Sequence, residues 1–476
     1  MARPNPAPDL PLAALLVGAL ALRLGLAAGL PGLYRPDEVF QTLEPAHALL
    51  DGWGVLAWEW HAGARNWVFP GLIAVVMALG TATGGGADIY LPALSALLAL
   101  LSLSSMWAAY RIGCLGGGRP AGLLAAAITA VWPDLLYFAA RPLPEVVGAH
   151  CVLLALAFAL GLKRPGAAGF RRAALATGAL LGLGFAVRIH MAPAIAVIGL
   201  WSLGRGWRVL PPMLAGAALP LLAMGVSDWI SWGVPFGSIW AYYRAQVIEG
   251  FSSHDGVMSG WFYLLAPLAA WGPWAAAVAV LAAIGALAAR PRPIGVVLAV
   301  IIAVVGFHSA FAFKLFSYIY LALPPLLALA AVGSLRLLGG GRVVLAAMLW
   351  LGIAAGVAAR APEREAWQSF ADYRGAFTLL RSWPALCGVA GYGGDWWVSY
   401  ALLDRKVPAF LDRRGERRAA IGAAANAYLV SPALAGAFPE ATKLRCGPEL
   451  CVLVRPGACV PSPEDEIGAV LRREGF

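Results

Sequence analysis

Long apolar runs alternate with short polar connections over the first 360 residues of the chain. Runs of about 15 to 22 residues are long enough to cross a bilayer as helices. They recur at 11–30, 90–110, 120–139, 143–162, 173–189, 191–204, 209–230, 268–289, 293–310, 318–335 and 342–359. A shorter run at 70–83 and the aromatic, Pro-interrupted stretch 260–274 are expected to lie at the membrane interface. The pattern predicts an all-α polytopic membrane domain with about eleven transmembrane helices.

Basic residues in the connections indicate which helix ends face the cytoplasm. Clusters of Arg and Lys follow every second apolar run, at 111–119, 163–172, 205–208, 290–292 and 336–342. By the positive-inside rule these connections and the N-terminus are cytoplasmic, and the other connections face outward. The segment 31–89 is then the first outer loop. High Ala, Gly and Arg usage favours a bacterial inner membrane with this side facing the periplasm; in a eukaryote the endoplasmic reticulum membrane would be expected.

From about residue 361 the sequence changes to the composition of a soluble domain. The segments CGVAGY, VPAFLD, AYLVS and LCVLVR read as strands, with a turn at CGPE before the last. We therefore divide the chain into a membrane domain, 1–360, and a small extracytoplasmic α/β domain, 361–476. Its four cysteines have neither Cys-x-x-Cys spacing nor His partners, which disfavours zinc and favours one or two disulfides outside the cytoplasm. Their pairing is left open: Cys387, Cys446, Cys451 and Cys459.

Composition excludes a soluble protein. The chain is 61% hydrophobic and 13% charged, whereas ordinary globular chains are roughly 25% charged. One globular core cannot bury so much apolar surface, so lipid must be the solvent for most of the chain. The formal net charge of +10 does not indicate nucleic-acid binding, because the basic residues form short clusters between apolar runs rather than a basic helix.

The first outer loop carries the candidate catalytic carboxylates. It combines acidic residues with several tryptophans directly after the first apolar run. Asp37 and Glu38 follow Pro36, which interrupts the preceding helix. A partly desolvated carboxylate at this position could remove a proton from an attacking sugar hydroxyl. The alternative interpretation is that this acidic pair belongs to an ordinary solvated loop.

Basic side chains recur at the predicted outward ends of the helices: Arg141, Arg188, His190, Arg244 and Lys314. The positive-inside rule disfavours cations there, so they need a reason. An anionic lipid phosphate would supply one, because Arg and Lys stabilise phosphate oxygens at low dielectric. Snorkelling to the headgroups is the alternative, as is pairing with acidic residues. The candidate acidic partners are Asp134, Glu145 and Asp228.

The loop sequence RPDEVFQTLEPAHALLDGWGVLAWEWHAGARNWVFPGL resembles the first outer loop of glycosyltransferase family 22 mannosyltransferases. The matching positions are Pro36, Asp37, Glu38, Gln41, Glu44, His47, Gly52, Gly54, Trp58, Glu59, Trp60, Arg65 and Pro70. Further on, ARPLPE at 140–145 is similar to the family's Arg-Thr-Leu-Ser motif. GFAVRIHMAP at 184–193 resembles its segment ending in Arg-Pro. HSAFAFKLFSYIYLALP at 308–324 has the spacing of its His-Ser and His-Lys-Glu-x-Arg motifs.

This resemblance, which covers about 31–325, implies a GT-C fold and inverting transfer of mannose from a polyprenyl- or dolichyl-phosphate donor. It implies that Asp37 is the base, with Glu38 as second candidate. Arg141, Arg188 and Lys314 match basic positions expected to hold the donor phosphate, and His190 joins them as a candidate. The remaining candidates, for acceptor or sugar contacts, are Trp58, Glu59, Arg65 and Arg244.

The sequence departs from the family at the charged cluster. Phe313, Leu315 and Ser317 stand where the family has His, Glu and Arg, and only Lys314 survives. The donor headgroup or its lipid is therefore open. Without a nucleotide-sugar site or an Asp-x-Asp pair in the outer loops, we expect no cofactor and no catalytic metal.

The expected partners are a polyprenyl-phosphate-linked sugar, a glycan or glycolipid acceptor and the lipid bilayer. Two alternatives remain: the same fold acting on a lipid-linked pentose or glucose, or a transporter that moves a lipid-linked sugar without cleaving it.

Overall fold

The computed structural model describes residues 9–30, 32–253, 256–289, 291–360, 370, 372–393, 398–412 and 417–473. The chain divides into two compact units. One combines Met1–Ala27 with Ser95–Ala361, and the other combines Ala28–Leu94 with Pro362–Phe476. The predicted first outer loop therefore folds in the same unit as most of the C-terminal segment. We call these the helical unit and the loop–tail unit, and describe each by itself.

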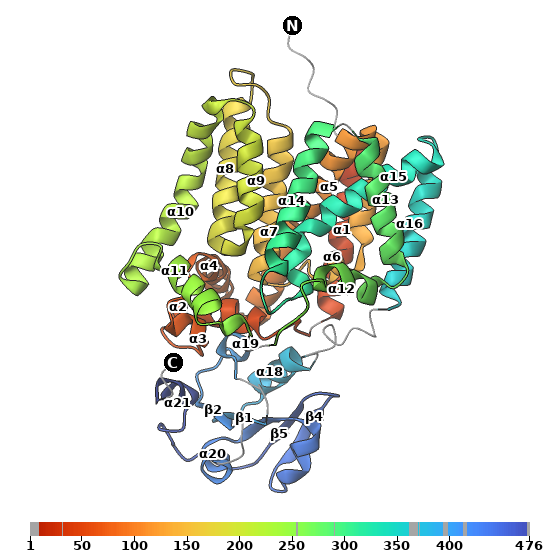
Figure 1. Cartoon of the computed structure of the whole chain (residues 1–476). Helices are drawn as coiled ribbons and strands as arrows, with labels where there is room; N and C mark the ends of the chain where they lie inside the picture. The colour runs from red at the N-terminus through yellow and green to blue at the C-terminus, as the bar shows by residue number, and fades with distance from the viewer. Residues whose placement is uncertain are drawn as a thin grey trace. The chain divides into compact units, whose positions relative to one another are not determined.

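Helices occupy all eleven of the predicted apolar runs (Figure 1). They are α1 (Leu10–Gly29), α5 (Ala87–Val131), α6 (Pro133–Tyr137), α7 (Pro144–Leu160), α8 (Phe170–Val187), α9 (Ala192–Leu203), α10 (Leu210–Trp232), α13 (Trp274–Ala288), α14 (Pro291–Ser309), α15 (Leu323–Leu338) and α16 (Val343–Ala358). Five segments of the described chain are long and apolar enough to span a membrane, and shorter apolar helices accompany them. The all-α polytopic class is confirmed. The number of crossings stays a prediction.

Helix α5 contains the predicted break between two runs. Gly117 and Gly118 leave helical geometry, and Gly118 has a φ of 78°, which favours glycine. Helix α1 packs across both halves of α5 through a cluster of Leu12, Ala19, Met106, Ala126 and Ala130.

Polar contacts at two points also fasten α1 to α5. The Asp9 carboxylate accepts hydrogen bonds from Arg119 at 2.9 and 3.1 Å and from the Tyr110 hydroxyl at 2.8 Å. Arg23, farther along α1, donates to Ser102.

Small residues allow other helices to approach backbone to backbone. A Cβ added at Gly285 or at Gly333 would collide with a backbone carbonyl of the facing helix, so α13 and α15 touch at both glycines. Further short segments of the helical unit include α11 (Gly237–Tyr243), α12 (Phe262–Trp271) and the 3₁₀ segment η6 (Phe316–Ala322). Helix α12 contains Pro267 and ends at Trp271, just before Gly272. Its predicted position at the membrane interface stays a prediction.

The loop–tail unit contains a five-stranded sheet with the strand order β2-β1-β3-β5-β4. Its strands are β1 (Val389–Tyr392), β2 (Ala409–Asp412), β3 (Ala427–Val430), β4 (Thr442–Cys446) and β5 (Cys451–Val454). Strand β1 pairs in parallel with β2 and β3, and β5 pairs antiparallel with β3 and β4. The four predicted strands are confirmed; β4 was missed.

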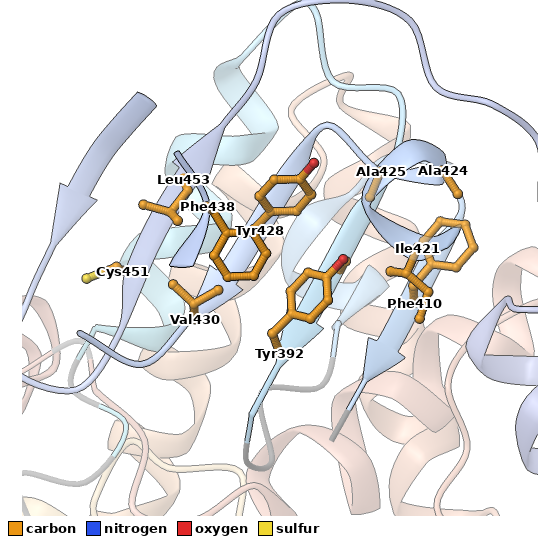
Figure 2. Close-up of a cluster of buried hydrophobic side chains, with 11 residues drawn as sticks. Tyr392, Phe410, Ile421, Ala424, Ala425, Tyr428, Val430, Phe438, Cys451 and Leu453 are labelled. Atoms are coloured by element: carbon orange, nitrogen blue, oxygen red, sulfur yellow. The ribbon is translucent and has the colours of Figure 1, made fainter. Parts of the chain in front are cut away.

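One face of this sheet carries an aromatic core (Figure 2). Tyr392, Tyr428 and Phe438 lie with their ring centroids 4.9 to 5.7 Å apart, beside Phe410 and Ile421. Burial of such rings is the main source of stability in a domain this small.

Two disulfides hold the tail part of the unit together. They join Cys387 to Cys459 and Cys446 to Cys451, the latter across the predicted CGPE turn. The pairing that the sequence left open is thereby decided.

The remaining helices of the loop–tail unit are short. Those of the first outer loop are a π-helical turn η1 (Val39–Leu43), α2 (Glu44–Asp51), α3 (Trp58–His61) and α4 (Val68–Ala82). Those of the tail are α18 (Tyr373–Ser382), α19 (Tyr400–Leu403), α20 (Arg418–Ala424), the 3₁₀ helix η8 (Pro432–Ala437) and α21 (Ile467–Arg473). Helix α4 matches the predicted short run at 70–83, and its interfacial position stays a prediction.

Candidate active site

The two carboxylates of the acidic pair in the first outer loop differ in their exposure to solvent. Asp37 is partly exposed, whereas Glu38 is 1% exposed. The Oε1 atom of Glu38 accepts the backbone N–H of Tyr34 at 2.6 Å, so this carboxylate closes the turn around Pro36. Asp37 is therefore the more accessible carboxylate of the two, and it leads directly into the buried turn η1.

Glu59 and Arg65, which are predicted to contact the acceptor or the sugar, form hydrogen bonds within the first outer loop. The carboxylate of Glu59 accepts from Gln41 Nε2 at 3.0 Å and from Arg65 Nη2 at 3.3 Å. The neighbouring Trp60 donates its indole N–H to the carbonyl oxygen of Phe40 at 3.1 Å. These contacts tie α3 to η1. Trp58, at the start of α3, is half-buried.

Glu44 joins the outer loop to the tail segment within the loop–tail unit. Its Oε1 accepts from Ser399 Oγ and from the backbone N–H of Ala401, both at 2.7 Å. Its Oε2 accepts the backbone N–H of Val55 at 3.0 Å. Burial raises the pKa of Glu44, against the opposing influence of His47 and of these hydrogen bonds.

Two further contacts reinforce this junction. The Tyr90 hydroxyl donates to the carbonyl oxygen of Ala401 at 2.5 Å. Asp404 Oδ2 accepts the backbone N–H of Ala87, the first residue of α5, at 2.8 Å. The chain that carries Asp37 is thus braced by residues more than three hundred positions away.

Four of the five basic candidates in the helical unit are buried. Arg188 and His190 share the neighbourhood of Tyr318, with the Arg188 guanidinium 5.9 Å and the His190 ring 5.9 Å from its centroid. His190 also meets the rings of Tyr242 and His308, at 5.1 and 5.6 Å. Both basic residues are buried, so this end of the unit presents a cationic and aromatic cluster.

Arg141 and Lys314 are each held by carbonyl oxygens. Arg141 stacks on the ring of Tyr137 at 4.0 Å and donates Nε to the Tyr137 carbonyl at 3.1 Å. Lys314 is 2% exposed and donates to the carbonyl oxygens of Met258, at 3.2 Å, and of Phe311. Hydrogen bonds to neutral carbonyl oxygens orient both cationic groups, and cationic groups of this kind bind anions such as phosphate.

Arg244 differs from these four. It is exposed and forms an ion pair with Glu249 at 3.0 Å. Such surface pairs contribute little to stability. No contact described here brings Arg244 to the other basic candidates.

The three buried acids considered as partners for the cations accept hydrogen bonds from neutral donors. Asp134 accepts the indole N–H of Trp271 at 2.8 Å. Glu145 accepts the hydroxyl of Ser317 at 2.8 Å, and Asp228 accepts that of Ser238 at 2.6 Å. Among the described residues, no group of three His, Cys, Asp or Glu side chains could hold a metal ion.

Two important residues were given no role from the sequence. Glu44 matches the family's loop motif, but the motif does not indicate its role, because Ser399 and Ala401 are brought to it only by folding. Arg23 did carry one: a lone charge inside an apolar run marks a functional or structural site. It is 1% exposed and donates to four neutral oxygen atoms.

Known mannosyltransferases are similar to this chain in sequence. The model of the Alg9-like mannosyltransferase family matches residues 15–361. GPI mannosyltransferase 3 of Drosophila melanogaster is 32% identical over 142 residues, which are 29% of this chain and 24% of that protein. GPI mannosyltransferase 3 of Yarrowia lipolytica is 46% identical over 55 residues, 12% of this chain and 11% of that protein. The matched segments thus span about a quarter of these relatives or less.

Among solved structures, ArnT from Cupriavidus metallidurans bound to undecaprenyl phosphate is similar, with a TM-score of 0.64 and 16% identity over 94% of this chain and 99% of that chain. Its apo state gives a TM-score of 0.61. At this identity the likeness shows a shared fold, the GT-C fold.

Proposed function

Since the chain belongs to the Alg9-like mannosyltransferase family, we propose that it is an inverting glycosyltransferase that takes mannose from a polyprenyl-phosphate donor. The acceptor is a glycan or glycolipid on the outer face of the membrane. The observation that carries the proposal is the family match over residues 15–361, which includes Asp37 and every basic candidate. The fold shared with ArnT, which was solved with undecaprenyl phosphate, supports a lipid-phosphate donor.

Asp37 acts as the general base in this proposal. It takes the proton of the acceptor hydroxyl as that oxygen attacks the anomeric carbon of the donor sugar. The bond from the anomeric carbon to the phosphate oxygen breaks as the new glycosidic bond forms on the opposite face, which inverts the configuration. Polyprenyl phosphate leaves with the bonding electron pair. The accessibility of Asp37, compared with the closed position of Glu38, supports this assignment and leaves Glu38 as second candidate.

The buried cations stabilise the leaving phosphate. Arg141, Arg188 and Lys314, with His190, offer donors in a desolvated setting, where charge–charge attraction is strongest. Trp58, Glu59, Arg65 and Arg244 are proposed to contact the sugar or the acceptor. We place the reaction at the periplasmic face of a bacterial inner membrane, with residues 361–476 outside the membrane.

A second candidate donor is a lipid-linked sugar other than mannose. Ser317, which stands where the family has Arg, hydrogen-bonds Glu145. This exchange removes a charge next to Lys314, and it favours a donor headgroup different from that of the family's motif.

The test is an assay of the purified protein with polyprenyl-phosphate-mannose and a crude glycolipid extract. We expect Asp37→Asn, which is nearly isosteric, to lower the transfer rate about 100- to 10,000-fold, the range for removal of a general base. Asp51→Asn is the matched control, because Asp51 is an exposed carboxylate of the same loop. Its rate should stay within about twofold of the wild type.

The outcomes distinguish the candidate functions. Full activity of Asp37→Asn would move the role of base to Glu38 or elsewhere. Transfer with another lipid-linked sugar but not with mannose would keep the enzyme and correct the donor. If neither protein consumes any lipid-linked sugar while competent acceptors are present, the transporter becomes the better interpretation.

A further inference from the structure

Arg23 is a buried cation in the middle of an apolar helix. Its Nε donates to Ser102 Oγ at 2.9 Å, and Nη1 donates to the carbonyl oxygens of Ala19 and Ala130, both at 3.2 Å. Nη2 donates to the carbonyl oxygen of Thr129 at 3.4 Å. All these residues belong to the helical unit. Every one of these acceptors is neutral, so these hydrogen bonds form no ion pair that would explain why a charged side chain is buried here.

The carbonyl acceptors explain the choice of Arg. Thr129 and Ala130 lie in the last turn of α5, which ends at Val131. Trp132 is extended, with φ −66° and ψ 124°, and Pro133 starts α6 without an N–H to donate. The last carbonyls of a helix have no partner within it, and lipid offers none. One guanidinium supplies donors to two of them and places positive charge at the negative end of the helix.

The segment that follows this helix end carries Arg141. From α5 the chain passes through α6, and Tyr137, the last residue of α6, both stacks under Arg141 and accepts its Nε proton. Asp134 of α6 is fixed separately by the indole N–H of Trp271. The direction in which α5 ends therefore sets where α6 begins, and with it the position of the Arg141 guanidinium.

We propose that Arg23 is a positioning residue for lipid-phosphate binding, which caps the C-terminal end of α5 and thereby holds α6 and Arg141 in place. This rests on the proposed function, in which Arg141 binds the donor phosphate. Arg23 itself is buried against neutral groups and does not meet the substrate. Its effect is on affinity for the lipid phosphate, beyond any effect on stability.

The experiment measures binding of undecaprenyl phosphate to the full chain in detergent, together with the melting temperature. The variants are Arg23→Met, which removes every donor, Arg23→Lys, which keeps the charge and fewer donors, and Arg141→Gln. Asp228→Asn is the matched control, because Asp228 is a buried ionisable residue that hydrogen-bonds Ser238 on α11 rather than the α6 segment.

We expect Arg23→Met to weaken binding at least tenfold and Arg23→Lys about threefold, with Asp228→Asn unchanged even if its melting temperature falls as much. A folded Arg23→Met that binds within twofold of the wild type overturns the proposal while the proposed function stands. If Arg23→Met does not fold, Arg23→Lys decides by the same twofold criterion. Equal binding by the wild type and Arg141→Gln would overturn the proposed role of Arg141, and this inference with it.

Discussion

Replacing Glu44 with Ala should detach the first outer loop from the tail segment. The buried carboxylate accepts three hydrogen bonds, from Val55, Ser399 and Ala401. The Ser399 hydroxyl can turn to another partner, but the two backbone N–H groups stay buried without one. Each unsatisfied buried donor costs about 1–3 kcal/mol, so we expect the loop–tail unit to lose about 4 kcal/mol of unfolding free energy.

This loss is large enough to measure by thermal unfolding. For a unit of this size class, 1 kcal/mol corresponds to a shift of about 2–4 °C in the melting temperature. Glu44→Ala should therefore lower it by about 8–16 °C in purified full-length protein, followed by tryptophan fluorescence and by proteolysis of the tail. Because Asp37 lies on the same braced loop, transfer activity should fall as well.

The control is Glu440→Ala, since Glu440 is an exposed glutamate of the same unit. Its melting temperature should stay within about 2 °C of the wild type, as for most surface substitutions. A shift for Glu44→Ala no larger than that of Glu440→Ala would refute the role of Glu44 as a brace. Full activity together with a large shift would separate the brace from catalysis.

Two further predictions concern the same unit. Burial raises the pKa of Glu44 above its ordinary value of 4.5, so the stabilising effect of the protonated group is fully present below that pH and is lost as pH rises through the raised pKa. As pH rises from 4.5 through the raised pKa, the wild type should therefore lose unfolding free energy relative to Glu44→Gln, which does not titrate at this position. A difference in unfolding free energy that does not change with pH would contradict the raised pKa. Removing the Cys387–Cys459 disulfide, whose cysteines are 72 residues apart, should lower the free energy of unfolding by about 4 kcal/mol. Removing Cys446–Cys451, whose cysteines are 5 apart, should lower it by about 2 kcal/mol. The difference arises because the longer loop gains more conformational entropy in the unfolded state when its disulfide is removed. Paired Cys→Ser variants followed by thermal unfolding test this order, and equal losses would contradict it.

The local elements of this protein could be predicted because their signals are local. An apolar run long enough for a bilayer and a run of β-branched and aromatic residues can each be recognised without knowing what they pack against. Strand β4 was not predicted because all five of its residues are exposed, so its sequence shows no alternation of buried and exposed positions. It forms only because β5 offers an edge with which to pair.

The candidate site was predictable where its residues form a contiguous motif. The loop around Asp37 and the basic positions at helix ends could be identified from the sequence, but the burial and hydrogen bonds of these residues could not. That Glu38 closes a turn while Asp37 stays accessible depends on the backbone N–H of Tyr34 reaching one carboxylate and not the other.

The sequence by itself determined the membrane class, the helices, four of the strands and the family, because hydrophobic length, periodicity and motifs are properties of neighbouring residues. Only the tertiary structure decided that Glu44 meets Ser399, that Cys387 meets Cys459 and that Arg23 caps the end of α5. Each of these contacts joins residues at least 70 positions apart. Such pairings depend on which groups are left buried without a partner once the helices and strands have packed.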